Sequence, residues 1–145
     1  MGKKRIIKQK KGGGLSPEMK ARALSRIPKK KLSSGIFYIQ ATYNNTRVTF
    51  TDDKGNVVMW ASSGNLGFKG ARKATPFAAS KVVELVADKA KTIGVKEIKI
   101  EVKGVGGGRE SAIRTLGAKG MIINSIKDTT PMPHNGPKAP KPRRV

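Results

Sequence analysis

The sequence predicts an α/β domain built on a mixed five-stranded sheet that is covered by helices. Three observations lead to this fold class. Residues 36–61 hold three short segments rich in β-branched and aromatic side chains, separated by turns. From residue 75 the spacing of apolar residues changes to the 3.6-residue period of a helix. An alternating strand, a second helix and a last strand follow, which completes two strand–helix–strand units.

The first strand is expected at residues 36–43, because β-branched and aromatic side chains favour extended backbone. Asn44 and Asn45 then form a turn, since Asn tolerates positive φ better than most residues. Residues 46–51 alternate, so that Val48 and Phe50 share one face of a second strand.

A polar turn at residues 52–56 leads to the third strand at residues 57–61, and Trp60 within it is interpreted as a core residue. Three consecutive strands with short turns form an antiparallel meander.

The first helix begins at Pro76, with Thr75 as its N-cap, and ends at Gly94. A proline is favoured at the first helical position because it lacks the N–H that a helix leaves unpaired there. The apolar stripe of this helix consists of Ala79, Val82, Val83, Val86, Ala90 and Ile93.

Residues 96–103 alternate strictly and form the next strand, followed by a glycine loop at 104–109. A short helix to about residue 119 and a last strand at 121–126 complete the fold. Because strand–helix–strand crossovers are right-handed, both loop-to-helix junctions are expected at the carboxyl edge of the sheet. The loop at 64–73 should therefore lie near the loop at 104–109.

Charge divides the chain into three parts. Residues 1–35 carry 12 Lys or Arg and one acid, residues 131–145 carry four cations and no acid, and the whole chain has net charge +22. Segments with such high charge and few apolar groups do not fold alone. We expect a basic N-terminal arm at 1–35 that is disordered until it meets a partner, with a short helix at Ser16. Residues 36–130 form the α/β domain, and 131–145 form an extended basic tail. The usual partner of such basic segments is nucleic acid.

Several classes of protein are disfavoured by composition. There is no cysteine, hence no disulfide framework and no thiol nucleophile. No apolar run reaches the ~20 residues of a membrane span, and the N-terminus lacks the apolar core of a secretory signal. A cytoplasmic location is expected; an organellar transit peptide, also basic and poor in acids, is the open alternative. Neither a cofactor nor a metal site is predicted.

The sequence lacks the groups of reactive side chains that an enzyme would need. The single histidine, His134, lies in the proline-rich tail, so no Ser-His-acid triad can form within the fold. Neither glycine loop continues with the Gly-Lys-Ser/Thr of a P-loop. A meander followed by two β-α units is also the outline of ribonuclease-H-type nucleases, which hold metal ions with several carboxylates. The first strand has no acid, so a nuclease is the weaker hypothesis.

The two glycine loops instead predict phosphate binding. Residues 64–73 combine three glycines with Lys69, Arg72 and Lys73, and lead directly into a helix N-terminus. Glycine lets a phosphate backbone approach closely, and helix N-termini attract anions. Phe68 has two interpretations: it stacks on a base, or it tucks under the loop. Folded RNA is favoured over DNA because no helix has a base-reading polar face.

From residue 36 to the end, the chain resembles the universal family of small-subunit ribosomal protein eleven, in its bacterial form. The residues that carry this resemblance are 43–46, 51–52, 60–61, 67–79, 102–104, 106, 108–111, 113–114, 128–136 and 143–145. They span about three quarters of the chain.

The resemblance implies a three-layer α/β/α domain of ribonuclease-H-like topology without a metal site. It also implies a structural place in the platform of the small subunit, bound to rRNA, beside ribosomal protein seven and near the exit of mRNA. The residues expected to contact rRNA are Asn44, Asn45, Gly67, Phe68, Lys69, Gly70, Arg72, Lys73, Thr75, Gly106, Gly108, Arg109, Arg114, His134, Asn135, Lys138, Lys141, Arg143 and Arg144.

Two further hypotheses remain. A free basic RNA chaperone has the same charge pattern as a ribosomal protein. Asn135-Gly136 is the only Asn-Gly pair, and glycine leaves the Asn side chain open to backbone attack, which makes Asn135 a candidate site of isoaspartate formation.

Overall fold

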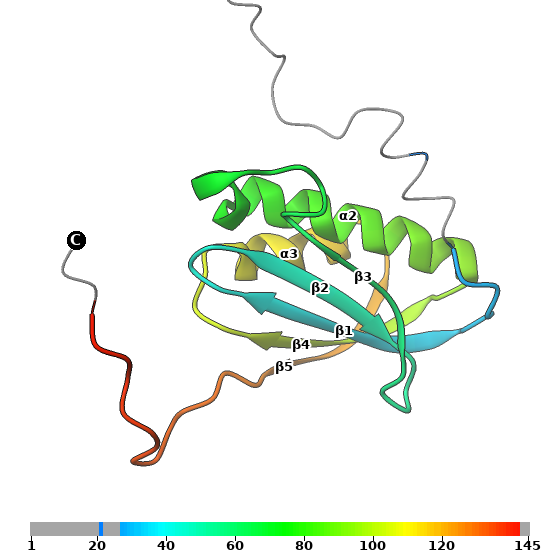
Figure 1. Cartoon of the computed structure of the whole chain (residues 1–145). Helices are drawn as coiled ribbons and strands as arrows, with labels where there is room; N and C mark the ends of the chain where they lie inside the picture. Colours follow the sequence, from blue (N-terminus) through cyan, green and yellow to red (C-terminus); the bar gives the residue numbers. More distant parts are fainter. Residues whose placement is uncertain (1–20, 22–26, 143–145) are drawn as a thin grey trace, which may run out of the picture.

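The computed structural model describes Ala21 and residues 27–142 of the chain (Figure 1). The short helix expected at Ser16, residues 1–20 and 22–26 of the basic arm expected at 1–35, and the terminal cations Arg143 and Arg144 lie outside the described residues.

The described part of the chain contains a mixed five-stranded sheet, as the sequence predicts. Its strands lie in the order β3-β2-β1-β4-β5. β1 pairs antiparallel with β2, and β2 with β3, whereas β1 pairs parallel with β4, and β4 with β5. The strands are β1 (Ser34–Ala41), β2 (Thr46–Thr51), β3 (Val57–Ser62), β4 (Glu97–Lys103) and β5 (Ile122–Asp128).

The crossover from β3 to β4 contains a 3₁₀ helix, η1 (Gly70–Ala74), which the sequence did not reveal, followed by α2 (Pro76–Ile93). The predicted N-cap is confirmed, because Thr75 Oγ1 accepts a hydrogen bond of 3.2 Å from the N–H of Ala78. Gly94 ends α2 at φ +101°, in the left-handed region that a glycine tolerates best. The second crossover contains α3 (Gly108–Ala118).

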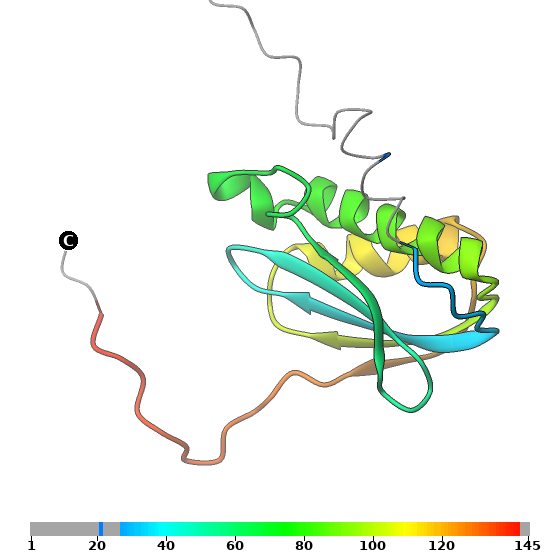
Figure 2. The same ribbon diagram turned by 45° about the vertical axis from the view of Figure 1, so that its right-hand side comes forward.

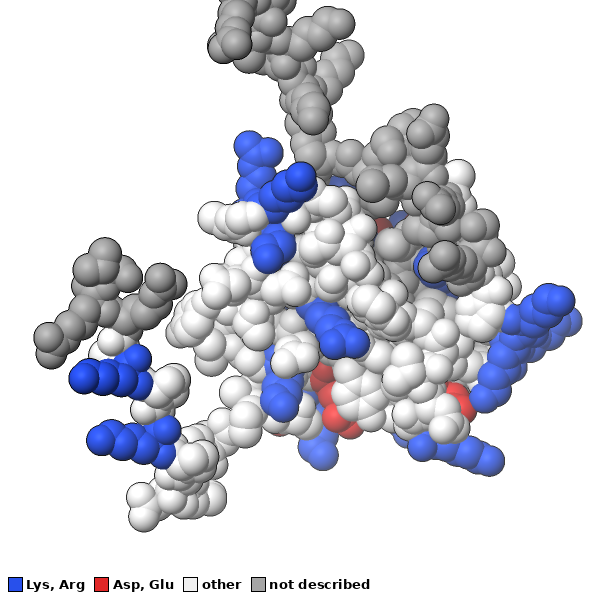
Figure 3. All heavy atoms as spheres, viewed as in Figure 1, with Lys and Arg blue, Asp and Glu red and all other residues white. Residues whose placement is uncertain are grey.

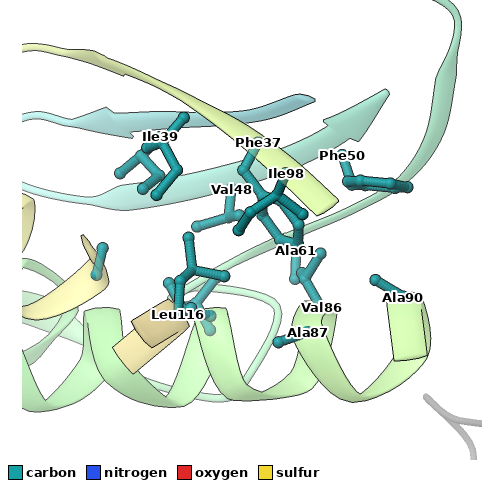
Figure 4. Packing of buried hydrophobic residues seen from close by; sticks show 14 of the residues in the cluster. Phe37, Ile39, Val48, Phe50, Ala61, Val86, Ala87, Ala90, Ile98 and Leu116 are labelled. Carbon is teal, nitrogen blue, oxygen red and sulfur yellow. The ribbon is translucent and has the colours of Figure 1, made fainter. Parts of the chain in front are cut away.

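One hydrophobic core fills the space between the sheet and the two helices (Figure 4). Alternate residues of the central strands point into it, among them Phe37 and Val48, and both are fully buried. The apolar stripe of α2 packs against these residues from the helix side, and the buried Leu116 of α3 lies beside it in the same core. The rings of Phe37 and Phe50 lie with their centroids 4.9 Å apart, near the end of α2.

The expected three-layer arrangement is wrong for the described residues, which form two layers. α2 and α3 lie against each other on the same face of the sheet (Figures 1 and 2). The physical reason is topological. The crossovers from β3 to β4 and from β4 to β5 advance in the same direction across the sheet, so one handedness places both helices on one side. The opposite face carries no helix within the part of the chain that is described.

The interpretation of Trp60 as a core residue is also wrong, since 47% of its surface is exposed. Met59 and Ala61, its neighbours on β3, are the buried residues. The alternation of the strand therefore points Trp60 to the helix-free face, where the Arg47 guanidinium carbon lies 5.0 Å from the centre of its ring.

β1 begins and ends two residues earlier than predicted. It ends at Ala41 because Thr42 closes the following turn: its N–H donates to the carbonyl of Asn45 at 2.9 Å, and its hydroxyl accepts from the N–H of Asn45 at 3.1 Å. Among the described residues other than glycine, only Asn135 has positive φ, so the Asn44–Asn45 turn forms without the positive φ that the sequence suggested.

A buried carboxylate organises the opposite edge of the sheet. Asp52 is 5% exposed and accepts hydrogen bonds from the N–H groups of Lys54 and Asn56, at 3.0 and 2.9 Å. Lys30 approaches it to 2.9 Å, which ties residues before β1 to the β2–β3 turn. The hydrogen bond from Lys30, and then those from Asn56, lower the pKa of Asp52 below its usual range.

Gly108 is the residue at which α3 packs most closely on its neighbours. A Cβ at this position would lie 2.6 Å from Thr46 Oγ1 and 2.8 Å from Ala79 Cβ, so Gly108→Ala should destabilise the fold by about 1–3 kcal/mol. Urea unfolding followed by circular dichroism measures this change.

Gly117→Ala, in the same helix, is the matched control. Its Cβ would have 4.0 Å to the nearest atom, so the better helix propensity of alanine should stabilise the protein by about 0.5–1 kcal/mol. Equal effects of the two substitutions would show that Gly108 is not a close-packing position.

Candidate nucleic-acid interface

Three loops meet at the carboxyl edge of β1, β3 and β4, at the left of Figures 1 and 2. They are the β1–β2 turn (residues 42–45), the β3–α2 connection (63–75) and the β4–α3 connection (104–107). We call them together the three-loop edge. The predicted proximity of the two glycine loops is confirmed, since a Cβ on Gly107 would lie 3.9 Å from the carbonyl oxygen of Ala74.

Backbone hydrogen bonds hold the three loops in register with the sheet. The N–H of Gly106 donates to the carbonyl of Ala41 at 2.9 Å, and the N–H of Ser63 donates to the carbonyl of Thr46 at 3.0 Å. A Cβ on Gly104 or Gly106 would overlap the backbone at the end of β1. These glycines therefore serve close packing within the fold, and the buried Gly106 and Gly108 offer no surface to a ligand.

The β3–α2 connection presents its cations outward. Ser63 and Leu66 are buried and anchor it. Gly67 and Gly70 have φ of +89° and +61°, and a Cβ on either glycine would meet no other atom within 4 Å. The backbone at these two positions is therefore open to an approaching group.

Lys69 and Arg72 are exposed at this connection, and Lys73 is half-buried. In Figure 3, Lys and Arg side chains gather at the upper left, where this connection lies, and again along the C-terminal tail. The N-terminus of α2 lies directly after these cations. Cations, open backbone and a helix N-terminus together form a surface suited to an anion.

Arg109, which the sequence placed among the rRNA contacts, has partners within the protein. Its Nη2 lies 2.5 Å from Asp128 Oδ2, and its Nη1 donates to the carbonyl of Gly104 and to Thr130 Oγ1. The N–H of Gly104 donates to the same Thr130 hydroxyl at 3.2 Å. Arg109 therefore fastens the start of the C-terminal tail to the three-loop edge, and 29% of its side chain remains exposed.

This network perturbs the ionisation of Asp128. Hydrogen bonds from the hydroxyl and N–H of Thr130, and then the Arg109 guanidinium, lower the pKa of Asp128 from 3.8 to about 2. The sequence offered no signal for the network, because its partners lie 19 to 26 positions apart.

The other predicted residues have different surroundings. Asn44 is exposed at the tip of its turn, whereas Asn45 Oδ1 is buried and, among the described atoms, has no hydrogen-bond partner. Thr75 caps α2 and also donates to the carbonyl of Arg72 at 2.8 Å. Arg114 is exposed on α3. The predicted contacts in the described part of the tail are all exposed: His134, Asn135, Lys138 and Lys141.

Aromatic side chains flank the cations, and sequence reasoning missed most of them. Phe68 is half-buried against the core, which supports the interpretation that it tucks under the loop. Its ring meets that of Phe77 edge-on, with centroids 6.2 Å apart, and Phe77 is 56% exposed. Phe77 lies outside the apolar stripe of its helix, and this position could have indicated from the sequence that its ring is exposed. Tyr43, 78% exposed, lies beside the Asn turn.

Helical membrane spans and clusters of metal ligands are both absent from the described residues. None of the helices in this part of the chain is long and apolar enough to cross a membrane. Within the same residues, no group of three or more His, Cys, Asp and Glu side chains is placed to hold a metal ion.

The family of the chain follows from its similarity to known proteins. The sequence model of the family described as "Ribosomal protein S11" matches residues 35–144 of the chain.

The chain belongs to the ribosomal protein S11 family.

Curated relatives agree with this assignment. The "Small ribosomal subunit protein uS11" of Helicobacter pylori strain G27 and that of strain P12 are each 52% identical over 124 residues, which is 85% of this chain and 95% of each relative. The protein of the same name from strain Shi470 is 51% identical over the same length. The resemblance stated from the sequence is therefore confirmed, and the relatives are bacterial.

Members of the S11 family are structural components of the ribosome and not enzymes. Family membership thus confirms the prediction of a non-enzymatic, rRNA-binding protein of the small subunit that takes part in translation. It also removes the nuclease hypothesis.

The Asp128 network should be pH-dependent in a defined direction. Because folding lowers the pKa of this carboxyl, its stabilisation of the tail is present above pH 3.8 and is lost as pH falls through about 2. The amide signals of Thr129 and Thr130 in NMR spectra should therefore shift with a midpoint near pH 2. Thr130→Val removes the largest cause and should raise that midpoint towards 3.8. A wild-type midpoint already at 3.8 would contradict the network.

Proposed function

We propose that the three-loop edge is the surface with which this S11-family chain binds folded small-subunit rRNA. The observation that carries the proposal is convergence: two glycine loops, the N-termini of α2 and α3 and the start of the basic tail all lie at one edge of the sheet (Figure 1). In this position the chain is a structural constituent of the platform.

The chemistry of the edge supports a phosphate backbone as ligand. Lys69 and Arg72 are exposed cations of the edge, and Arg114 is exposed on α3, which begins there. A Cβ on Gly67 or Gly70 would meet no atom within 4 Å, so a phosphate can approach the backbone closely at both positions. Folded RNA is recognised by shape, phosphates and 2′-hydroxyls, which suits a surface of loops better than a base-reading helix. Each phosphate contact should lower log K by about 0.7–0.9 per unit of log salt concentration.

Finer features belong to the same proposal. Residues 1–35 and 131–145 extend the rRNA-binding surface of the domain at 36–130 as basic arms, and Lys138 and Lys141 contribute from the tail. The domain has a ribonuclease-H-like topology without its metal site. The chain neighbours ribosomal protein seven and helps to form the mRNA exit region of a bacterial-type cytoplasmic ribosome.

Charge reversal at the edge tests the proposal. Arg72→Glu should reduce incorporation into reconstituted small subunits by about tenfold, because it removes a phosphate contact and adds repulsion, while the circular dichroism spectrum stays unchanged. Arg109→Glu should act in the same direction, since it also places a second carboxylate beside Asp128. Co-sedimentation with subunits after a high-salt wash is the measurement.

Lys54→Glu provides a matched control, because Lys54 is exposed in the β2–β3 turn at the opposite edge of the sheet. Its incorporation should equal that of the wild type. If all three variants incorporate normally, the loops are turns and the proposed surface is wrong. Release of the wild-type chain at moderate salt would favour a free RNA chaperone.

We also propose Asn135 as a site of isoaspartate formation. It is exposed and has φ +56°. Attack of the Gly136 nitrogen on the Asn side-chain carbonyl releases ammonia and forms a succinimide, which water opens to aspartate or isoaspartate. Peptide mapping of aged protein should find isoaspartate at residue 135, and Gly136→Ala should slow its formation. Unaltered asparagine in aged and in ribosome-derived protein would reject the proposal.

A further inference from the structure

The helix-free face of the sheet is a second surface, separate from the three-loop edge. The pairing register places Trp60 of β3, Thr49 of β2 and Tyr38 of β1 side by side across three strands. Paired residues project to the same face, and Trp60 projects away from the core. We call this broad side of the sheet the open face.

Two aromatic rings lie on the open face. Trp60 is 47% exposed, and Tyr38 is half-buried two strands away, at a spacing of about 10 Å. Core packing does not account for Trp60, because Met59 and Ala61 fill the core from β3. A Trp held at the surface next to an Arg is an arrangement suited to stacking with a planar ligand.

The charge of the open face favours an anionic ligand. By register, Gln40 of β1 pairs with Arg47 on one side and with Lys103 on the other, so two exposed cations lie in the row next to the aromatic row. Figure 3 shows Lys and Arg side chains interspersed among uncharged ones over the front of the sheet, with fewer acids. The charged residues of this face are Arg47, Lys99, Lys103 and Lys127 against Glu97 and Glu101.

We propose that the open face binds a single-stranded RNA segment. A base stacks on Trp60, a second base stacks on Tyr38, and Arg47 and Lys103 neutralise the phosphates between and beyond them. Stacking on exposed aromatic residues next to cations is how proteins hold unpaired nucleotides on a flat sheet. The ligand differs from that of the three-loop edge, which offers cations and open backbone to folded RNA.

Charge complementarity argues against the chain itself as the occupant. The N-terminal arm has net charge +11 and a second copy has +22, so a cationic face repels both. An acidic protein segment would meet the cations but would leave the aromatic pair without planar partners. RNA satisfies the cations and the rings together.

Trp60 reports on this site directly, because it is the only Trp in the chain. The full-length protein is titrated with a 12-nucleotide oligouridine, with an oligoadenine of the same length, and with heparin as a polyanion that has no bases. Both oligonucleotides should quench Trp60 fluorescence by at least half, adenine more strongly, whereas heparin binds without quenching. Equal quenching by heparin would overturn the proposal.

Variants separate stacking from binding by the arms. Trp60→Leu keeps apolar surface but removes the ring, and should weaken oligoadenine binding at least fivefold in fluorescence anisotropy. Ile126→Ala is the control. Ile126 is 55% exposed and pairs with Ile100, whose side chain faces the core, so Ile126 lies on the helix side of the sheet and not on the open face. Unchanged affinity of Trp60→Leu, or RNA binding without quenching, would overturn the proposal.

Two further measurements keep the outcome clear. Arg72→Glu should leave the quenching intact, so failure of the three-loop edge and failure of the open face are distinguishable. An acidic oligoglutamate peptide should not compete with the oligonucleotide for Trp60. If the peptide abolishes quenching by RNA when the two carry the same total charge, the open face binds an acidic protein partner. That result would overturn the RNA assignment.

Discussion

The close approach of the 104–108 backbone to the ends of β1 and β2 is the constraint on which the rest of the structure depends. Gly106 donates to Ala41, and Gly108 lies against Thr46 and Ala79 with no room for a side chain. This contact fixes where α3 begins and seats it beside α2 on the core. It also brings the β4–α3 connection level with the β1–β2 turn and the β3–α2 connection. One packing contact therefore produces both the helical layer and the candidate interface.

The cations of the chain divide into two kinds by their surroundings. Lys69 and Arg72 project from a connection that is anchored underneath by buried residues, so their charge is available to a ligand. Arg109 is engaged by Asp128, Thr130 and a backbone carbonyl, and fastens the tail to the same edge. The proposed rRNA-binding surface thus combines exposed cations with a paired one that positions the start of the basic tail.

Particular residues show how far sequence reasoning reached. Thr75, Pro76 and Gly94 marked the ends of α2 correctly because capping is local: a hydroxyl reaches an N–H three residues on, and a glycine tolerates the left-handed turn. The prediction that Trp60 lies in the core was wrong because a strand has two faces, and the sequence of the strand alone does not say which face the helices cover. The prediction of a third layer was wrong because the face on which a helix lies depends on the order of the strands in the sheet, which the sequence does not give.

The sequence by itself determined the order of the strands and α-helices, the charge of the arms and the family, since these follow from periodicity, capping and long ordered motifs. Tertiary structure alone decided that both helices lie on one face, that Arg109 binds Asp128, and that Trp60 meets Arg47 on the open face. The physical reason is range. Periodicity and caps act over a few residues. The contacts Arg47–Trp60, Arg109–Asp128 and Gly104–Thr130 instead join positions 13 to 26 apart and arise only when the strands and loops come together in the fold.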